Sequence, residues 1–359
     1  MQVLFLLLKV KKKQKFKAGL SRRISFLVLM AMNANGRSVR RLHGLLLVLF
    51  AVLAAPRVVN ADVWIDWNAG ATIESKEYTA SNETYHIRIK GNVKMNGHVQ
   101  VGDNNSVGTT MIVEIDPSVT GPVTLTHTGN ADVLFAVHDN CKLIIRGKDN
   151  DHRIIIEGNN THTTYEMIGT AGTLDMQYVT VQNNHQVKES NNGVIKINPG
   201  WEEKHKLGTT TIKNCSFINC SAGYATVLYT SNEKDPRANP DNTPTSCAIV
   251  MEDVLIDRCE ATGYDGSLKS NPAEDTDPGS GWAGIMRFRG VWLGNFTMKH
   301  VEIKKCSAEY SCAGVFWNAM GDPKNTARQP KLTVIGCKFH DNKCERSGGR
   351  DANRDFLRI

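Results

Sequence analysis

Five segments of the chain repeat one pattern of apolar and polar residues without gaps. Each has 11 residues, and they start at Leu174, Thr210, Ile249, Phe296 and Leu332. Apolar residues stand two apart in two short runs around a polar corner, which is the pattern of two short strands. The starts are 36, 39, 47 and 36 residues apart. Stacked coils explain this uneven spacing, because an insertion at one corner leaves the other positions of a coil in place.

The last column of the alignment predicts an internal ladder, formed by Asn184, Cys220, Cys259, Cys306 and Asn342. An asparagine amide at such a position can hydrogen-bond the neighbouring coils, and a cysteine there acts as a small buried apolar residue. Stacked side chains point the same way, which strains a disulfide. We therefore expect three buried free thiols, and any disulfide to involve Cys306, Cys312 or Cys344 near the C-terminal end.

Further strands are predicted on both sides of these segments. A third strand follows in four coils, at 193–197, 225–229, 283–287 and 313–317, and earlier strands lie at 87–89, 111–113, 133–137, 143–145 and 154–156. Residues 87–359 are thus expected to form one all-β domain, a right-handed parallel β-helix solenoid of nine or ten coils. Residues 62–86 are expected to cap the N-terminal end of the core. The abrupt end after Asn342 predicts that the solenoid is truncated at the C-terminus.

Residues 1–61 are predicted to be a leader. Arg37, Arg40 and Arg41 precede an apolar run at 45–55, and Val59-Asn60-Ala61 suits a cleavage site before Asp62. This is the pattern of a secretory signal peptide, at about 32–61. Residues 1–29 are interpreted as the product of a start codon assigned too early. The alternative is a membrane anchor, although neither apolar run there reaches the ~18 residues of a span.

The leader also explains the overall charge of +7. It holds 12 of the 43 Lys and Arg residues and no Asp or Glu, so the remainder has 31 basic and 36 acidic residues, or 31 − 36 = −5. That balance argues against a nucleic-acid partner, which needs many cations to neutralise phosphates. The mature part is expected to be secreted or to lie at the cell surface, without a stable membrane span.

From about Ile87 to Asn342 the chain resembles the right-handed parallel β-helix superfamily that includes pectate lyases. The resemblance rests on Asn184 and Asn342 in the ladder and on the short apolar runs 143–147 and 154–158, each ending in Gly. A weaker similarity is to adhesin-like surface proteins with polymorphic outer-membrane repeats, through the FxxN match at 339–342. These resemblances imply the fold more than the function.

Four long insertions flank the third strand, at 198–207, 231–246, 264–281 and 318–330. Loops on a rigid scaffold often carry function, so this side is the candidate binding surface. The aligned residues Ile197, Tyr229, Arg287 and Trp317 would form a platform for a sugar or uronic acid if they face outward. In the alternative strand register, Tyr229 and Trp317 are buried.

A catalytic site is the rival prediction. Polysaccharide lyases of this fold use an Arg or Lys base with calcium held by carboxylates, and hydrolases use paired Asp. The lyase candidates are Arg287 and Arg289 with Glu274, Asp275 and Asp277. The competing interpretation makes the acidic loop an ordinary turn and gives Arg287 a structural ion pair. No hydrolase signature is present, and no histidine has an evident nucleophile partner in the sequence.

These patterns lead to a function with one alternative. We expect an adhesin-like or glycan-binding surface protein whose partner is a polysaccharide or a host or cell-surface glycan. The alternative is a polysaccharide lyase or glycoside hydrolase acting on pectin-like acidic glycans. No cofactor or metal site is expected, except calcium in the lyase case.

Overall fold

The structure is a computed structural model of the chain. It divides the chain into two compact units, Met1–Val59 and Asn60–Ile359. Every described residue belongs to the second unit, and the predicted leader lies outside the described residues. The structure describes residues 62–128, 133–160, 162–163, 166–186, 193–197, 207–223, 225–230, 247–262, 284–291, 294–308, 312–320, 329–344 and 357–358.

The described residues form strands and no helix. Sheet A contains, in order, β1 (Val63–Trp67), β4 (Thr84–Ile89), β7 (Thr110–Ile115), β10 (Lys142–Arg146), β14 (Thr173–Gln177), β18 (Thr210–Lys213), β22 (Ile249–Glu252), β26 (Asn295–Lys299) and β30 (Lys331–Ile335). Sheet B contains β2 (Thr72–Ile73), β5 (Val93–Met95), β8 (Val123–His127), β11 (Ile154–Glu157), β15 (Val179–Gln182), β19 (Ser216–Ile218), β23 (Leu255–Asp257), β27 (Glu302–Lys304) and β31 (Lys338–His340).

Two further sheets complete the fold. Sheet C contains β3 (Lys76–Tyr78), β6 (Val99–Val101), β9 (Phe135–Val137), β13 (Ile168–Thr170), β17 (Ile195–Ile197), β21 (Ala225–Thr230), β25 (Gly284–Val291), β29 (Cys312–Met320) and β33 (Leu357–Arg358). The narrow sheet D contains β12 (His162–Thr163), β16 (His185–Gln186), β20 (Ser221–Ala222), β24 (Glu260–Ala261), β28 (Ser307–Ala308) and β32 (Lys343–Cys344).

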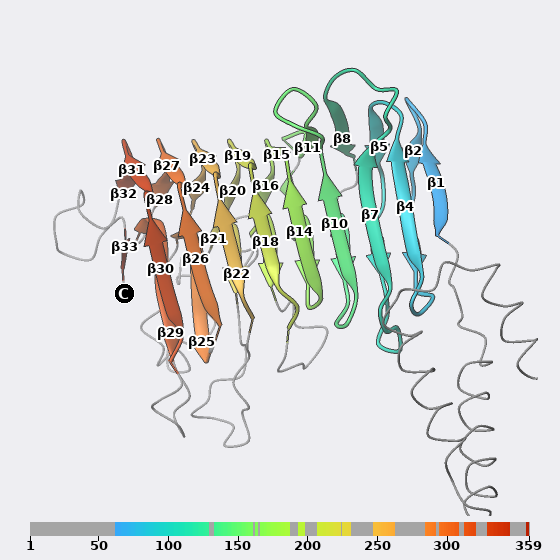
Figure 1. Cartoon of the computed structure of the whole chain (residues 1–359). Helices are drawn as coiled ribbons and strands as arrows, with labels where there is room; N and C mark the ends of the chain where they lie inside the picture. Colours follow the sequence, from blue (N-terminus) through green and yellow to red (C-terminus); the bar gives the residue numbers. More distant parts are fainter. Residues whose placement is uncertain are drawn as a thin grey trace, which may run out of the picture. The chain divides into compact units, whose positions relative to one another are not determined.

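Each pass of the chain contributes one strand to sheets A, B and C in turn, and neighbouring strands are parallel. Nine passes therefore stack as nine coils, within the expected nine or ten, and Figure 1 shows the strands of successive coils side by side. The five repeated segments pair in the register that the alignment predicts, with Leu174, Thr210, Ile249, Phe296 and Leu332 in one column.

The first coil begins earlier than expected. Strand β1 pairs with β4, β2 with β5 and β3 with β6, so residues 63–78 already form a complete coil. The predicted start near Ile87 is therefore too late, and the segment expected as a cap has the same strand order as the coils after it. The corner after β1, at 68–71, is longer than the corners of the five repeated segments, so the first coil does not align with them in the sequence.

The core is built from columns of inward-facing residues, one from each coil. In sheet A, one such column runs through Ile87, Val113, Ile145, Met176, Ile212, Met251 and Met298, all fully buried. Each of these side chains is covered by the coil before it and the coil after it. The alternate residues of sheet A face outward and carry charges that pair between coils, such as Lys213 with Glu252 at 2.9 Å.

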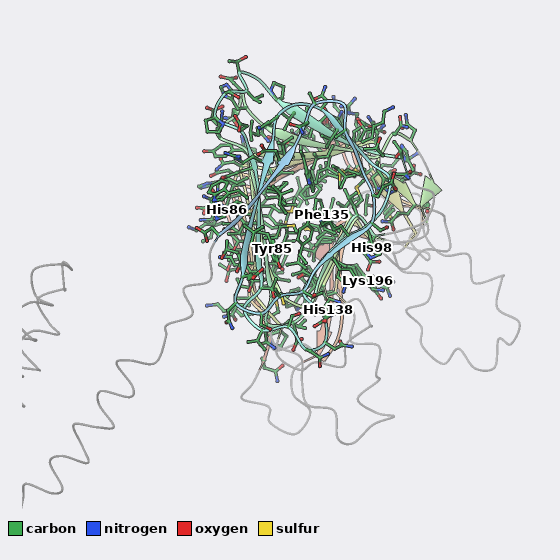
Figure 2. All side chains as sticks on the ribbon, turned by 90° about the vertical axis from the view of Figure 1, so that its right-hand side faces the viewer. Tyr85, His86, His98, Phe135, His138 and Lys196 are labelled. Carbon is green, nitrogen blue, oxygen red and sulfur yellow. The ribbon has the colours of Figure 1, made fainter. Side chains whose placement is uncertain are left out.

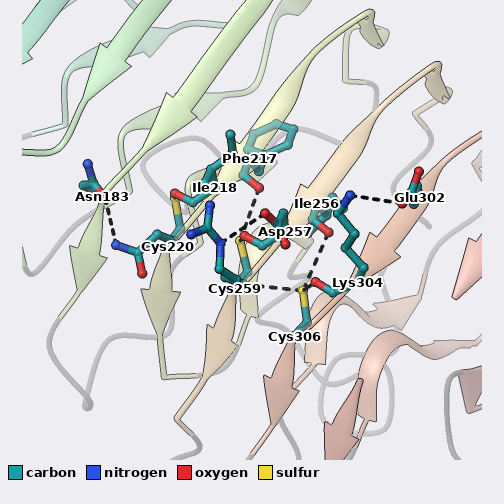
Figure 3. A network of polar contacts seen from close by, with 12 residues as sticks. Asn183, Phe217, Ile218, Cys220, Ile256, Asp257, Cys259, Glu302, Lys304 and Cys306 are labelled. Carbon is teal, nitrogen blue, oxygen red and sulfur yellow. Dashed lines mark hydrogen bonds and ion pairs between the residues drawn. The ribbon is translucent and has the colours of Figure 1, made fainter. Parts of the chain in front are cut away.

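The predicted ladder is a continuous column in the structure, and Figure 3 shows three of its members in adjacent coils. Asn184 begins the column, and its buried amide has no hydrogen-bond partner among the described residues. Each of the other four side chains donates to a carbonyl oxygen of the preceding coil. The bonds are Cys220 Sγ to Val181 O at 3.8 Å, Cys259 Sγ to Phe217 O at 3.6 Å, Cys306 Sγ to Ile256 O at 3.8 Å and Asn342 Nδ2 to Ile303 O at 2.9 Å.

The ladder side chains also accept hydrogen bonds from the coil before them. The Cys259 N–H donates to Cys306 Sγ at 3.4 Å, and the Cys306 N–H donates to Asn342 Oδ1 at 2.9 Å. Cys220, Cys259 and Cys306 are buried free thiols. Burial, followed by the adjacent thiols, raises the pKa of Cys259 well above its ordinary value. Cysteine therefore makes both contacts that asparagine makes at this position, with longer bonds.

Candidate functional site

The outer face of sheet C holds the residues predicted to bind a ligand. Strand pairing places Lys196, Tyr229 and Arg287 next to one another in one column, at steps of about 4.8 Å. The neighbouring column, which faces the core, contains Ile197, Thr230, Phe288 and Trp317. The predicted column of Ile197, Tyr229, Arg287 and Trp317 therefore mixes two faces of the sheet and is wrong at both of its ends.

The residues that the alignment matched are not those that pair. Tyr229 pairs with Lys196 and not with Ile197, and Arg287 pairs with Phe316 and not with Trp317. Pairing between β21 and β25 shifts between Ala225 and Leu228, and pairing between β25 and β29 shifts between Gly284 and Met286. A shift of one residue moves a side chain to the opposite face of a strand. An alignment that starts each strand at its small residue therefore misplaces Ile197 and Trp317 by one position.

Trp317 is part of the core and not of a surface platform. Its ring lies 4.9 Å from the ring of Phe288 and 6.4 Å from that of Phe296, measured between centroids. Tyr229 and Arg287 face outward but are only 4% and 0% exposed. The exposed platform predicted at Tyr229, Arg287 and Trp317 is therefore corrected to a buried column made by Lys196, Tyr229 and Arg287.

Lys196 is the member of this column that the sequence reasoning overlooked. Its side chain is 8% exposed, and no hydrogen bond or ion pair joins its ammonium group to another described residue. The next residues of the column, Gly169 and Ala136, have no large side chain. Figure 2 looks along the coils and shows Phe135 in the interior, with Lys196 and His138 towards one side of the shaft. In the sequence, only an alignment with the correct register between β17 and β21 would have placed Lys196 beside Tyr229.

The long insertions adjoin strands of sheet C in the sequence. In chain order, residues 198–206, 231–246 and 321–328 lie between a strand of sheet C and the next strand of sheet A, and 263–283 lie between β24 and β25. These ranges lie outside the described residues. The same holds for the lyase candidates Glu274, Asp275 and Asp277. Arg289 lies in β25 with Arg287, but its side chain is not among those described.

A hydroxyl–imidazole pair on sheet D was also missed, because the two residues are 36 positions apart. His185 Nδ1 lies 2.8 Å from Ser221 Oγ, and His185 Nε2 lies 3.1 Å from Asn160 Oδ1. A proton on Nε2 leaves Nδ1 to accept from the Ser221 hydroxyl. The N–H groups of Ser221 and Glu260 are engaged by Asn184 O and Cys220 O, so neither is available to stabilise an oxyanion. We assign this pair a structural role between coils.

No group of three or more His, Cys, Asp or Glu side chains gathers as a metal site within the described part of the chain. Asp149, in the acidic run 149–151, accepts hydrogen bonds from the N–H groups of Asp151 and His152, both at 2.9 Å. Contact with His152 is also the main cause of the lowered pKa of Asp149. These bonds are those of a turn.

Comparison of the chain with known proteins found no relative. No family model, curated protein or solved structure matches the chain. Among the described residues, no helix has the length and hydropathy to cross a membrane.

Proposed function

We propose that this chain is a secreted or cell-surface right-handed parallel β-helix protein that binds an acidic glycan over the outer face of sheet C. The observation that carries the proposal is the column of Lys196, Tyr229 and Arg287, in which two cations flank an aromatic ring. The column belongs to the sheet whose strands adjoin the long insertions in the sequence, as expected for an adhesin-like or glycan-binding solenoid.

The finer assignments rest on general rules and on the resemblance. Connections between parallel strands of one sheet are right-handed in nearly all proteins, which favours a right-handed helix like that of the pectate-lyase-like superfamily. Secretion is supported by the signal-peptide pattern at about 32–61. The cell-surface location follows from the same leader and from the similarity to adhesin-like repeats.

The chemistry of the column favours an anionic sugar. A uronate carboxylate attracts a Lys ammonium or an Arg guanidinium, and the attraction is stronger where water is excluded. Since Lys196 is nearly buried and has no carboxylate partner among the described residues, a ligand carboxylate would satisfy it.

The test is binding of the secreted chain to polygalacturonate, measured by calorimetry. Lys196→Met should weaken binding about tenfold or more, because a hydrogen bond to a charged group is worth about 1.5–3 kcal/mol. Lys299→Met, on the outer face of sheet A, is the matched control and should bind like the unaltered chain. Equal affinity of Lys196→Met and the unaltered chain would overturn the proposed site.

The same samples test the enzymatic alternative, a lyase or glycoside hydrolase acting on pectin-like acidic glycans. A lyase would use Arg287 or Arg289 as base, with calcium on Glu274, Asp275 and Asp277. Release of unsaturated product in the presence of calcium, lost in Arg287→Ala while folding is retained, would establish the lyase in place of the binding protein. Release of saturated fragments would establish a hydrolase.

A further inference from the structure

The chain contains six triplets of the form Asn-x-Ser/Thr, which is the acceptor motif for N-linked glycans. Asparagine is also a common turn residue, so the motif alone does not identify a modified side chain. The structure separates the six by exposure, by backbone conformation and by the hydrogen bonds that each triplet already makes. Their asparagines are Asn82, Asn104, Asn159, Asn214, Asn219 and Asn295.

Five of the six triplets have a structural explanation. Four of the asparagines stand at corners with φ between 51° and 59°, the left-handed conformation that asparagine tolerates better than most residues. These four are Asn82, Asn159, Asn214 and Asn219. In the triplet that begins at Asn104, the Ser106 hydroxyl is buried and donates to Thr79 O at 2.6 Å. The fold therefore hides the hydroxyl that the acceptor motif requires.

Asn295 has no such explanation. It is an exposed residue at the start of β26, although strands disfavour asparagine. Side chains alternate across a strand, so Asn295 and Thr297 face outward from sheet A while Phe296 between them is fully buried. Neither Asn295 nor Thr297 makes a side-chain hydrogen bond to another described residue. The acceptor amide and the hydroxyl of this triplet thus lie unengaged on one surface.

The surroundings of Asn295 leave room for a bulky group. Its partner in the following coil is Lys331, and the register of β22 with β26 continues to Ala248 in the preceding coil. Both neighbours are exposed, and Ala248 has no side-chain atom beyond Cβ. A group attached to Asn295 would therefore extend into solvent from sheet A. The strands of sheet C contain no acceptor triplet, so the proposed binding column would stay uncovered.

We infer that Asn295 carries an N-linked glycan. The inference rests on the proposed secretion of the chain, because the glycan donor and its transferase belong to the secretory pathway. In the transfer, the Nδ2 nitrogen attacks the anomeric carbon of an oligosaccharide held on a lipid diphosphate. A C–N bond forms as the C–O bond to the diphosphate breaks. The amide gives one proton to a base of the transferase, and the lipid diphosphate leaves with the electron pair of the broken bond.

The test is peptide mapping of the full chain, produced in cells that attach N-linked glycans and collected from the medium. Enzymatic hydrolysis of the glycan–asparagine bond converts the carrier asparagine to aspartate, so the mass of the peptide identifies the modified position. We expect this conversion at position 295. A secreted chain whose Asn295 is unmodified would overturn the inference and leave the proposed secretion standing. A chain retained in the cytosol without glycans would overturn both.

Two changes at Thr297 test the triplet without altering the acceptor. Thr297→Val removes the hydroxyl and keeps the shape, and valine suits this column because Val250 occupies it in the preceding coil. This variant should lose the glycan at Asn295, while any glycan on another triplet stays. Thr297→Ser keeps the hydroxyl and is the matched control, so it should retain the glycan. Modification of Asn295 that survives Thr297→Val would overturn the assignment.

Discussion

At the scale of single residues, the ladder shows that cysteine can replace asparagine between stacked coils. Cys306 and Asn342 both donate to a carbonyl three residues before the ladder position of the preceding coil, and both accept from the N–H of that ladder position. The thiol contacts are 3.4–3.8 Å long and weaker than the amide bonds of 2.9 Å. The ladder therefore requires a side chain of suitable shape with modest polarity.

This equivalence predicts the effect of changing one ladder residue. Cys259→Ala should lower the free energy of unfolding by about 1–2 kcal/mol, because it removes the sulfur from a fully packed position. Cys259→Asn should lose less, because its amide can bond Phe217 O and the Cys220 N–H in the way that Asn342 bonds the coil before it. Urea denaturation of both variants provides the comparison. If Cys259→Asn is the less stable variant, the ladder selects for apolar packing alone.

At the scale of elements, the corners between strands depend on residues with left-handed backbones. Before the ladder stand Asn183, Asn219, Arg258, Lys305 and Asp341, with φ between 52° and 57°. Between sheets A and B stand Tyr178, Asn214, Asp253, His300 and Gly336, with φ between 49° and 60°. Residues such as Tyr178 and His300 disfavour this conformation, so stacking against neighbouring coils maintains it.

Another corner requires glycine because coils approach closely there. A Cβ on Gly172 would lie 2.3 Å from the carbonyl oxygen of His138 and 2.4 Å from that of Cys141, both in the preceding coil. Gly172→Ala should therefore lower the thermal midpoint, at a cost of about 1–3 kcal/mol. Gly121→Ala is the control, since no atom lies within 4 Å of its added Cβ. A Gly172→Ala protein as stable as Gly121→Ala would contradict the spacing of these coils.

The sequence predicted some elements better than others for a physical reason. In sheets A and B the repeated segments have no insertions, so alternation alone places Val181, Phe217 and Ile256 on the inner face in register. In sheet C the strands follow insertions of unequal length and pair with irregularities. The alternation of apolar and polar residues does not reveal a register slip of one residue. The sequence alignment therefore assigned Trp317 to the outer face and overlooked Lys196.

At the scale of the whole molecule, repetition made the coil number predictable and made the ends and the site harder to predict. The first coil has the strand order of the rest but a different corner, which hid it within the expected cap. The site depends on side chains from several coils. The proximity of Lys196, Tyr229 and Arg287 is therefore evident only when the coils are stacked in their register.

The central claim is that an acidic glycan binds over sheet C, and hydrogen–deuterium exchange with and without polygalacturonate tests it most directly. Bound glycan should slow exchange in peptides covering β17, β21 and β25, which carry Lys196, Tyr229 and Arg287. Peptides covering β14, β18 and β22, which belong to the same coils but to sheet A, should exchange as before. Slowed exchange confined to sheet A, or none in sheet C under conditions where the glycan is bound, would contradict the account.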